Sequence, residues 1–68
     1  MTWDELKEEA KKMGYKGHEN VEWSGLYTRV GDDNIVAFYK DGHIEINNEL
    51  LMSDRTPEQM IMIMKGLE

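Results

Sequence analysis

Apolar side chains recur at helical spacing close to the beginning of the chain. The members of this first stripe are Trp3, Leu6, Ala10 and Met13. Intervals of three and four residues place them on one side of a helix. Thr2 and Glu5 have the Ser/Thr-x-x-Glu spacing of a capping box, in which each side chain accepts a hydrogen bond from a free backbone N–H. Gly14 follows the stripe, where a left-handed cap belongs. The pattern predicts a helix from about Trp3 to Met13.

A second helical stripe lies near the other end of the chain. Its members are Met60, Ile61, Ile63, Met64 and Leu67. Thr56 is placed to cap this helix, Pro57 suits its first position, and Gln59 completes a second capping-box pattern. The residues between the two stripes follow a different rule, because apolar and polar positions there alternate, which is typical of strands.

Three strands are predicted, near residues 23–30, 35–40 and 43–48, after a polar loop at 16–20. Asp41-Gly42 indicates a two-residue hairpin turn, because a type I′ turn needs positive φ at both central positions. This turn sets Tyr39 opposite Ile44 and Phe38 opposite Glu45. A four-residue turn, Gly31 to Asn34, joins the first two strands. Residues 48–55 hold an apolar trio that extends or follows the third strand.

These registers divide the strand residues between two faces, since side chains alternate across a sheet. One face is apolar and is expected to meet the helices: Leu26, Thr28, Val30, Ile35, Ala37, Tyr39, Ile44 and Ile46. The other face mixes aromatic and charged residues: Tyr27, Arg29, Val36, Phe38, Lys40, His43, Glu45 and Asn47. A bulge at Ser24-Gly25 would decide which face receives Trp23. The expected fold is α+β, a single domain over residues 1–68 in the order α-β-β-β-α, with a three-stranded antiparallel meander and both helices packed on one face.

The mixed face is the candidate partner-binding surface. Its proposed contact residues are Tyr27, Arg29, Phe38, Lys40, His43 and Trp23. Aromatic residues and arginine are enriched at protein-binding hot spots, and an exposed apolar patch with a polar rim often marks an interaction site. A second interpretation stays open, in which the last helix or another subunit covers this face and Phe38 is ordinary core.

Charge and composition argue against several classes of function. The chain has no cysteine, so disulfides and thiolate metal sites are excluded, and its net charge is −6. No cluster of lysine and arginine exists that could bind nucleic-acid phosphates or an anionic membrane surface. Acids near the start of the chain do not fit a secretory signal, and the expected compartment is the cytoplasm. We expect no metal, no cofactor and no catalytic residue, because no spacing of His18, His43 or the carboxylates matches such a site.

Several short segments resemble small proteins of Gram-positive bacteria and their phages that carry no assigned activity. The segments are Thr-Trp-Asp-Glu-Leu-Lys at the start, Gly-Tyr after the first helix, the Lys-Asp-Gly hairpin and the closing Asp-Arg-Thr-Pro-Glu-Gln-Met. The resemblance implies a phage or mobile-element setting, and it brings no activity and no site.

The favoured function is therefore a non-enzymatic protein-interaction module, with a homodimer as one form of it. The alternative is an acidic inhibitor or regulator that mimics phosphates toward a basic nucleic-acid-binding protein. Residues 41–68 hold six acids and two bases, a net charge of −4, which would attract such a partner.

Overall fold

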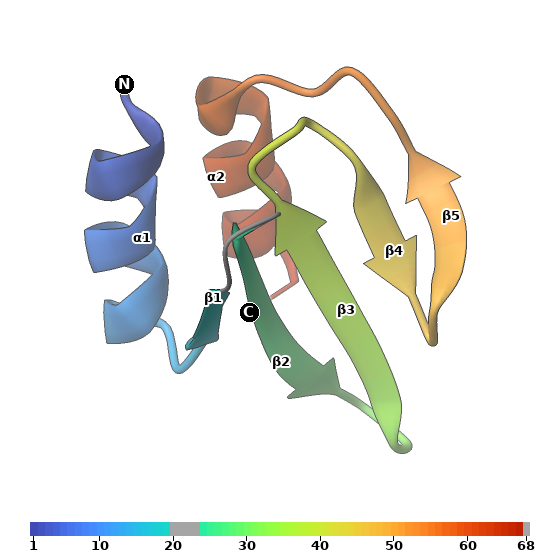
Figure 1. Cartoon of the computed structure of the whole chain (residues 1–68). Helices are drawn as coiled ribbons and strands as arrows, with labels where there is room; N and C mark the ends of the chain where they lie inside the picture. Colours follow the sequence, from blue (N-terminus) through green and yellow to red (C-terminus); the bar gives the residue numbers. More distant parts are fainter. Residues whose placement is uncertain (20–23, 68) are drawn as a thin grey trace.

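The computed structural model describes residues 1–19 and 24–67, which form two helices and a five-stranded antiparallel sheet (Figure 1). The strands follow one another in space in chain order, so the sheet is a meander. The elements are α1 (Trp3–Lys12), β1 (Lys16–Glu19), β2 (Ser24–Val30), β3 (Asn34–Tyr39), β4 (Ile44–Ile46), β5 (Glu49–Met52) and α2 (Pro57–Gly66).

Both helices begin as their sequences predict, whereas α1 ends at Lys12, one residue before the predicted Met13, and Leu67 follows the end of α2. The Thr2 side chain accepts a hydrogen bond from the Glu5 N–H, and the Glu5 carboxylate accepts one from the Thr2 N–H. Thr56 and Gln59 form the same reciprocal pair at α2. After α1, Gly14 has φ +95° and its N–H donates to the Lys11 carbonyl, as in a left-handed C-terminal cap.

The two helices lie on the same side of the sheet (Figure 1). Their apolar stripes and one face of the strands make a single core, which among the described residues has ten buried members: Leu6, Ala10, Tyr15, Leu26, Val36, Phe38, Ile44, Met60, Ile61 and Met64. The α+β class is thus confirmed, whereas the three-stranded meander is wrong in strand number. The segment predicted as a loop at 16–20 contains β1, and the apolar trio after residue 48 belongs to β5.

Residues 40–43 join β3 to β4, and a hydrogen bond between Tyr39 and His43 leaves three of them, Lys40 to Gly42, in the turn, where the sequence predicted two. Tyr39 N–H donates to the His43 carbonyl, and Gly42 N–H donates to the Tyr39 carbonyl. Gly42 has φ +103° while Asp41 does not have positive φ, as in three-residue hairpins that end in a glycine bulge. The Asp41 carboxylate accepts a hydrogen bond from the His43 N–H at 3.0 Å and holds the loop. Phe38 therefore pairs with Ile44, one position away from the predicted register.

The loop between β2 and β3 also differs by one residue from its prediction. It contains Gly31 to Asp33, with Gly31 and Asp33 at positive φ, and Val30 pairs with Asn34 in place of Ile35. Since each loop shifts the register by one, β3 is turned over relative to the prediction, while β2 and β4 keep their predicted faces.

This rotation of β3 overturns the predicted position of Phe38. Its side chain is 0% exposed and contacts the ring of Tyr15 edge to face, with centroids 5.7 Å apart. Val36 is buried with it, whereas Ile35, Ala37 and Tyr39 lie on the opposite face. Phe38 belongs to the core and offers no surface to a partner.

Candidate functional site: the open sheet face

The face of the sheet that points away from the helices carries a mixed set of side chains. Register fixes most of its members, because residues directly paired across strands point to the same side. We call this surface the open sheet face, and it consists of Lys16, Tyr27, Arg29, Ile35, Ala37, Tyr39, His43, Glu45 and Leu50.

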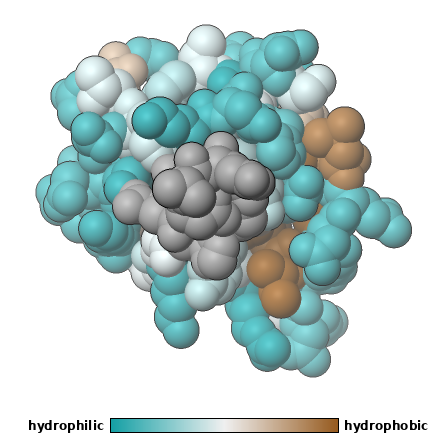
Figure 2. Space-filling view, viewed as in Figure 1, coloured by the Kyte–Doolittle hydropathy of each residue, from teal (hydrophilic) through white to brown (hydrophobic). Residues whose placement is uncertain are grey.

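Large apolar side chains are exposed on the open sheet face. Tyr27 is 38% exposed, Ile35 42% and Leu50 65%. Figure 2 shows hydrophobic side chains gathered on the side where Figure 1 places β4 and β5, beside a mostly hydrophilic surface. A patch of this kind with a polar rim is typical of an interaction surface.

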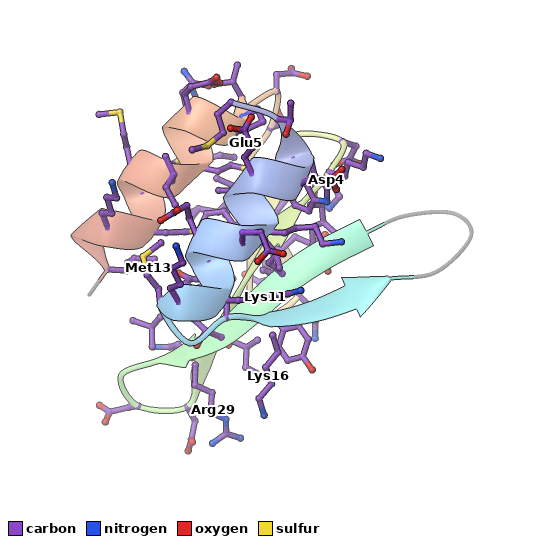
Figure 3. The ribbon with its side chains drawn as sticks, turned by 90° about the vertical axis from the view of Figure 1, so that its left-hand side faces the viewer. Asp4, Glu5, Lys11, Met13, Lys16 and Arg29 are labelled. Atoms are coloured by element: carbon purple, nitrogen blue, oxygen red, sulfur yellow. The ribbon has the colours of Figure 1, made fainter. Side chains whose placement is uncertain are left out.

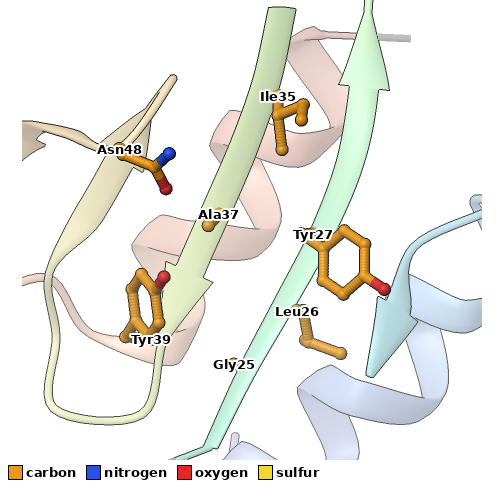
Figure 4. Close-up of a pocket in the computed structure, with 7 residues that line it drawn as sticks. All are labelled: Gly25, Leu26, Tyr27, Ile35, Ala37, Tyr39 and Asn48. Atoms are coloured by element: carbon orange, nitrogen blue, oxygen red, sulfur yellow. The ribbon is translucent and has the colours of Figure 1, made fainter. Parts of the chain in front are cut away.

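A shallow hollow of about 230 Å³ lies at the centre of this face (Figure 4). Ala37 and Gly25 have little or no side chain and form its floor, while the rings of Tyr27 and Tyr39 and the side chain of Ile35 stand around it. The hollow exists because small residues alternate with large ones along β2 and β3. It is open to solvent, so it can receive a protruding side chain from another surface.

Cationic side chains lie at the β1–β2 end of the face. Lys16 and Arg29 extend from their strands away from α1 (Figure 3). Arg29 Nη1 lies 2.7 Å from Asp33 Oδ1, with both side chains largely exposed. An exposed pair of this kind contributes little stability, so Arg29 can turn toward a partner at small cost. Together with Tyr27, these two residues surround a second hollow of about 280 Å³.

Acidic side chains lie at the opposite end of the face, around His43. The two ring nitrogens of His43 face different carboxylates: Nδ1 contacts Asp41, and Nε2 lies 3.0 Å from Glu45 Oε2. The His43 ring stacks on Tyr39 with centroids 4.2 Å apart. Burial, followed by the charge and hydrogen bond of Glu45, raises the pKa of the Tyr39 hydroxyl above its ordinary value of 10.0. Tyr39 therefore stays a neutral hydrogen-bond donor at physiological pH.

The predicted site residues are only partly together in the structure. Tyr27, Arg29 and His43 lie on the open sheet face, whereas Phe38 is in the core. Lys40 is exposed within the β3–β4 loop. Trp23 lies outside the described residues.

The sequence analysis missed the residues that replace Phe38 at the centre of the face. Ile35, Ala37 and Tyr39 were expected in the core, and Lys16 and Leu50 were not assigned to any strand. One signal could have found Leu50, the member on β5. Asn47-Asn48 is a pair of residues that tolerate positive φ, and both adopt it in the turn between β4 and β5.

In residues 1–19 and 24–67, no three His, Asp or Glu side chains converge as metal ligands. No helix in this part of the chain has the length and apolar character needed to cross a membrane.

Comparison with known proteins adds no relative. A scan against protein-family models, a search of curated proteins and a search of solved structures each returned no match. The resemblance to small phage and bacterial proteins stays a prediction, and the function must be argued from the open sheet face.

Proposed function

We propose that the chain is a non-enzymatic protein-interaction module that binds its partner through the open sheet face. The observation that carries the proposal is the exposure of Tyr27, Ile35 and Leu50 on one face, while the helices cover the other. Covering these side chains would remove apolar surface from water, which stabilises a complex by about 25 cal/mol per Å².

The composition of the face supports binding rather than chemistry. Tyrosine and arginine are the residue types that dominate binding hot spots, and tyrosine loses little conformational entropy on contact. The titratable side chains near the hollow contact one another, because His43 lies between Asp41 and Glu45. This arrangement orders the rim of the surface.

The acidic alternative lacks comparable support. Two of the acids that give residues 41–68 their charge, Asp41 and Glu45, contact His43 of the same chain. A phosphate mimic needs its carboxylates directed outward to a basic partner, so we favour the open sheet face.

A photo-crosslinking amino acid tests the proposal. We would place it at Ile35 in the open sheet face and, as controls, at exposed Lys11 and Met62 on the helices. Irradiation of cells that express the protein should give a discrete adduct from position 35. The adduct should disappear when Leu50→Ser and Tyr27→Ser are added, because these changes remove apolar contacts and leave the core intact. Equal adducts from all three positions, or none from position 35, would contradict the proposal.

A further inference from the structure

The open sheet face has opposite charge at its two ends. The register places five residues in one row across the sheet, in the strand order β1 to β5: Lys16, Tyr27, Ala37, Glu45 and Leu50. A cation thus lies at the β1 end, an anion lies on β4, and the smallest side chain lies on the central strand. Arg29 adds to the cationic end and Asp41 to the anionic end.

We propose that a second copy of this chain covers the open sheet face, related by a two-fold axis that runs parallel to the strands above β3. The proposal rests on the proposed function, because it names the partner of the same surface. It follows from the order of charges along the row, which is complementary to itself only in this orientation.

An axis parallel to the strands brings β2 of one copy over β4 of the other. Tyr27 then faces Glu45 of the second copy, and its hydroxyl can donate to that carboxylate. Glu45 already contacts His43, but a carboxylate has about four acceptor positions and can accept again. Lys16 lies over Leu50 of the second copy, with its ammonium within one strand spacing, about 4.8 Å, of Glu45. Each contact occurs twice by symmetry.

The other two-fold orientation is unfavourable. An axis perpendicular to the strands would place Lys16 against Lys16 and Glu45 against Glu45. Like charges that face each other across an interface oppose association. The charge order along the row therefore selects one dimer from the two that face-to-face packing allows.

The shape of the face fits the same arrangement. Sheets that pack face to face lie about 10 Å apart, with their strands within about 30° of parallel. Ala37 lies under the axis, where two large side chains would collide. Gly25 pairs with Tyr39 at the edge of the hollow, and this space can take the His43 ring of the second copy.

The size of the molecule is compatible with this dimer, and the charged residues of its helices lie away from the interface. A standard interface covers about 800 Å² of each partner. This is about a sixth of the 4663 Å² accessible surface of the chain, and one side of a compact molecule can supply that area. Of the net charge of −6, α1 on the far side of the sheet contributes −1, from four acids and three bases, and the acidic Glu58 of α2 lies on that side as well. At physiological ionic strength charges are screened beyond about 8 Å, so these acids oppose association only weakly.

Charge reversal gives a sharp test, read as molar mass against concentration by sedimentation equilibrium. Lys16→Glu places two acids against each other in each half of the dimer, and Glu45→Lys places two bases there. Each variant should weaken self-association about tenfold or more, which corresponds to about 1.4 kcal/mol. An equimolar mixture of the two variants should associate more tightly than either variant alone. In one half of the mixed dimer, the acid introduced in one copy lies near the base introduced in the other. A chain that carries both reversals should recover in the same way.

Two controls protect this interpretation. Lys11→Glu makes the same charge change on α1 and should leave self-association unchanged. Glu45→Gln keeps an acceptor for His43 and should weaken the dimer less than Glu45→Lys, and circular dichroism should show that all variants are folded.

The outcomes separate this inference from the proposed function. A wild-type chain that stays monomeric at millimolar concentration overturns the dimer, and so does a dimer that ignores all of these reversals. An adduct from position 35 to a different protein would then preserve the binding role and exclude the second copy as its partner. Absence of any adduct at position 35 together with a monomeric chain would overturn both.

Discussion

The two faces of the sheet carry similar kinds of residue, but one face is buried under the helices and the other is exposed to solvent. On the covered face Leu26, Phe38 and Ile44 are fully buried, whereas on the open sheet face Tyr27 and Ile35 are about two-fifths exposed. Hydrophobicity of the strands alone does not separate them. The helices bury the face whose side chains complete their core, and the lengths of two short loops decide which residues of β3 are on it. The difference teaches that register, more than composition, determines which aromatic residues are available to a partner.

The largest expected effect comes from truncating the buried aromatic residue of β3. Phe38→Ala should lower the free energy of unfolding by about 3–5 kcal/mol, because it removes a ring from the core and leaves a cavity. Ile35→Ala, on the open sheet face of the same strand, should cost about 1 kcal/mol or less, because its side chain is already partly in water. Urea unfolding followed by tryptophan fluorescence measures both.

Phe38→Leu keeps the comparison measurable if the alanine variant does not fold. It retains much of the side-chain volume and should cost less than Phe38→Ala but more than Ile35→Ala. Equal losses at positions 35 and 38 would mean that both faces of β3 are buried alike, and the distinction between the two faces would fail.

The next largest loss of stability is expected from a substitution in the β3–β4 loop, which sets the register of β3 against β4. Gly42 has φ +103°, and a Cβ there would lie 3.1 Å from the Arg55 carbonyl oxygen, a backbone atom. The Arg55 N–H also donates to the Gly42 carbonyl at 2.8 Å. Gly42→Ala should therefore cost about 2 kcal/mol or more, from both strain and crowding. Thermal unfolding with the calorimetric enthalpy measures the loss.

Gly31 provides the matched control in the other loop. It also has positive φ, but a Cβ there would meet nothing within 4 Å. Gly31→Ala should cost about 1 kcal/mol, from strain alone. If the two substitutions cost the same, close packing of Arg55 against Gly42 does not help to fix the register of β3.

The helices were predictable from the sequence because their signals are local. Thr2 with Glu5, Thr56 with Gln59, and Gly14 each act within one turn of chain, and the structure shows every one of these contacts. Apolar spacing then identifies the buried side of each helix without knowledge of the rest of the fold.

The sheet was less predictable, because its faces depend on one-residue differences in loop length. Asp41-Gly42 suits a two-residue I′ turn and equally suits a three-residue loop that ends in glycine. Packing of Gly42 against Arg55, thirteen residues later, favours the three-residue loop. The residues around Gly42 do not by themselves predict that contact. Because both loop lengths were predicted wrongly by one residue, the two faces of β3 were exchanged in the prediction. Phe38 was therefore assigned to the site, and Tyr39 was assigned to the core. Tyr27, Arg29 and His43 were found because β2 and the residues leading into β4 kept their predicted faces.

A smaller loss of stability should come from removing the N-terminal cap of α2, one of the two helices that cover the sheet. Thr56→Ala removes the side-chain acceptor for the Gln59 N–H and should cost about 1 kcal/mol. Thr56→Ser keeps the acceptor and serves as the control. Hydrogen exchange should show faster opening of the first turn of α2, while the amides of β3 exchange only as fast as the global loss of stability requires. Unchanged exchange in α2 would show that packing of Met60 and Met64, rather than the cap, holds the helix on the sheet.

The smallest expected effect lies on the open sheet face and depends on pH. The pKa of Tyr39 is raised in the folded chain, so the unfolded chain loses that proton first as pH rises. The stability that Tyr39 contributes is complete below its ordinary pKa of 10.0 and is lost as pH rises through the folded-state value. Tyr39→Phe removes this ionisation, so its free energy of unfolding should fall less than that of wild type between pH 9 and 11, a range of about one unit on either side of the ordinary pKa. Parallel curves for the two proteins would mean that neither the burial of the Tyr39 hydroxyl nor its contact with Glu45 persists in solution.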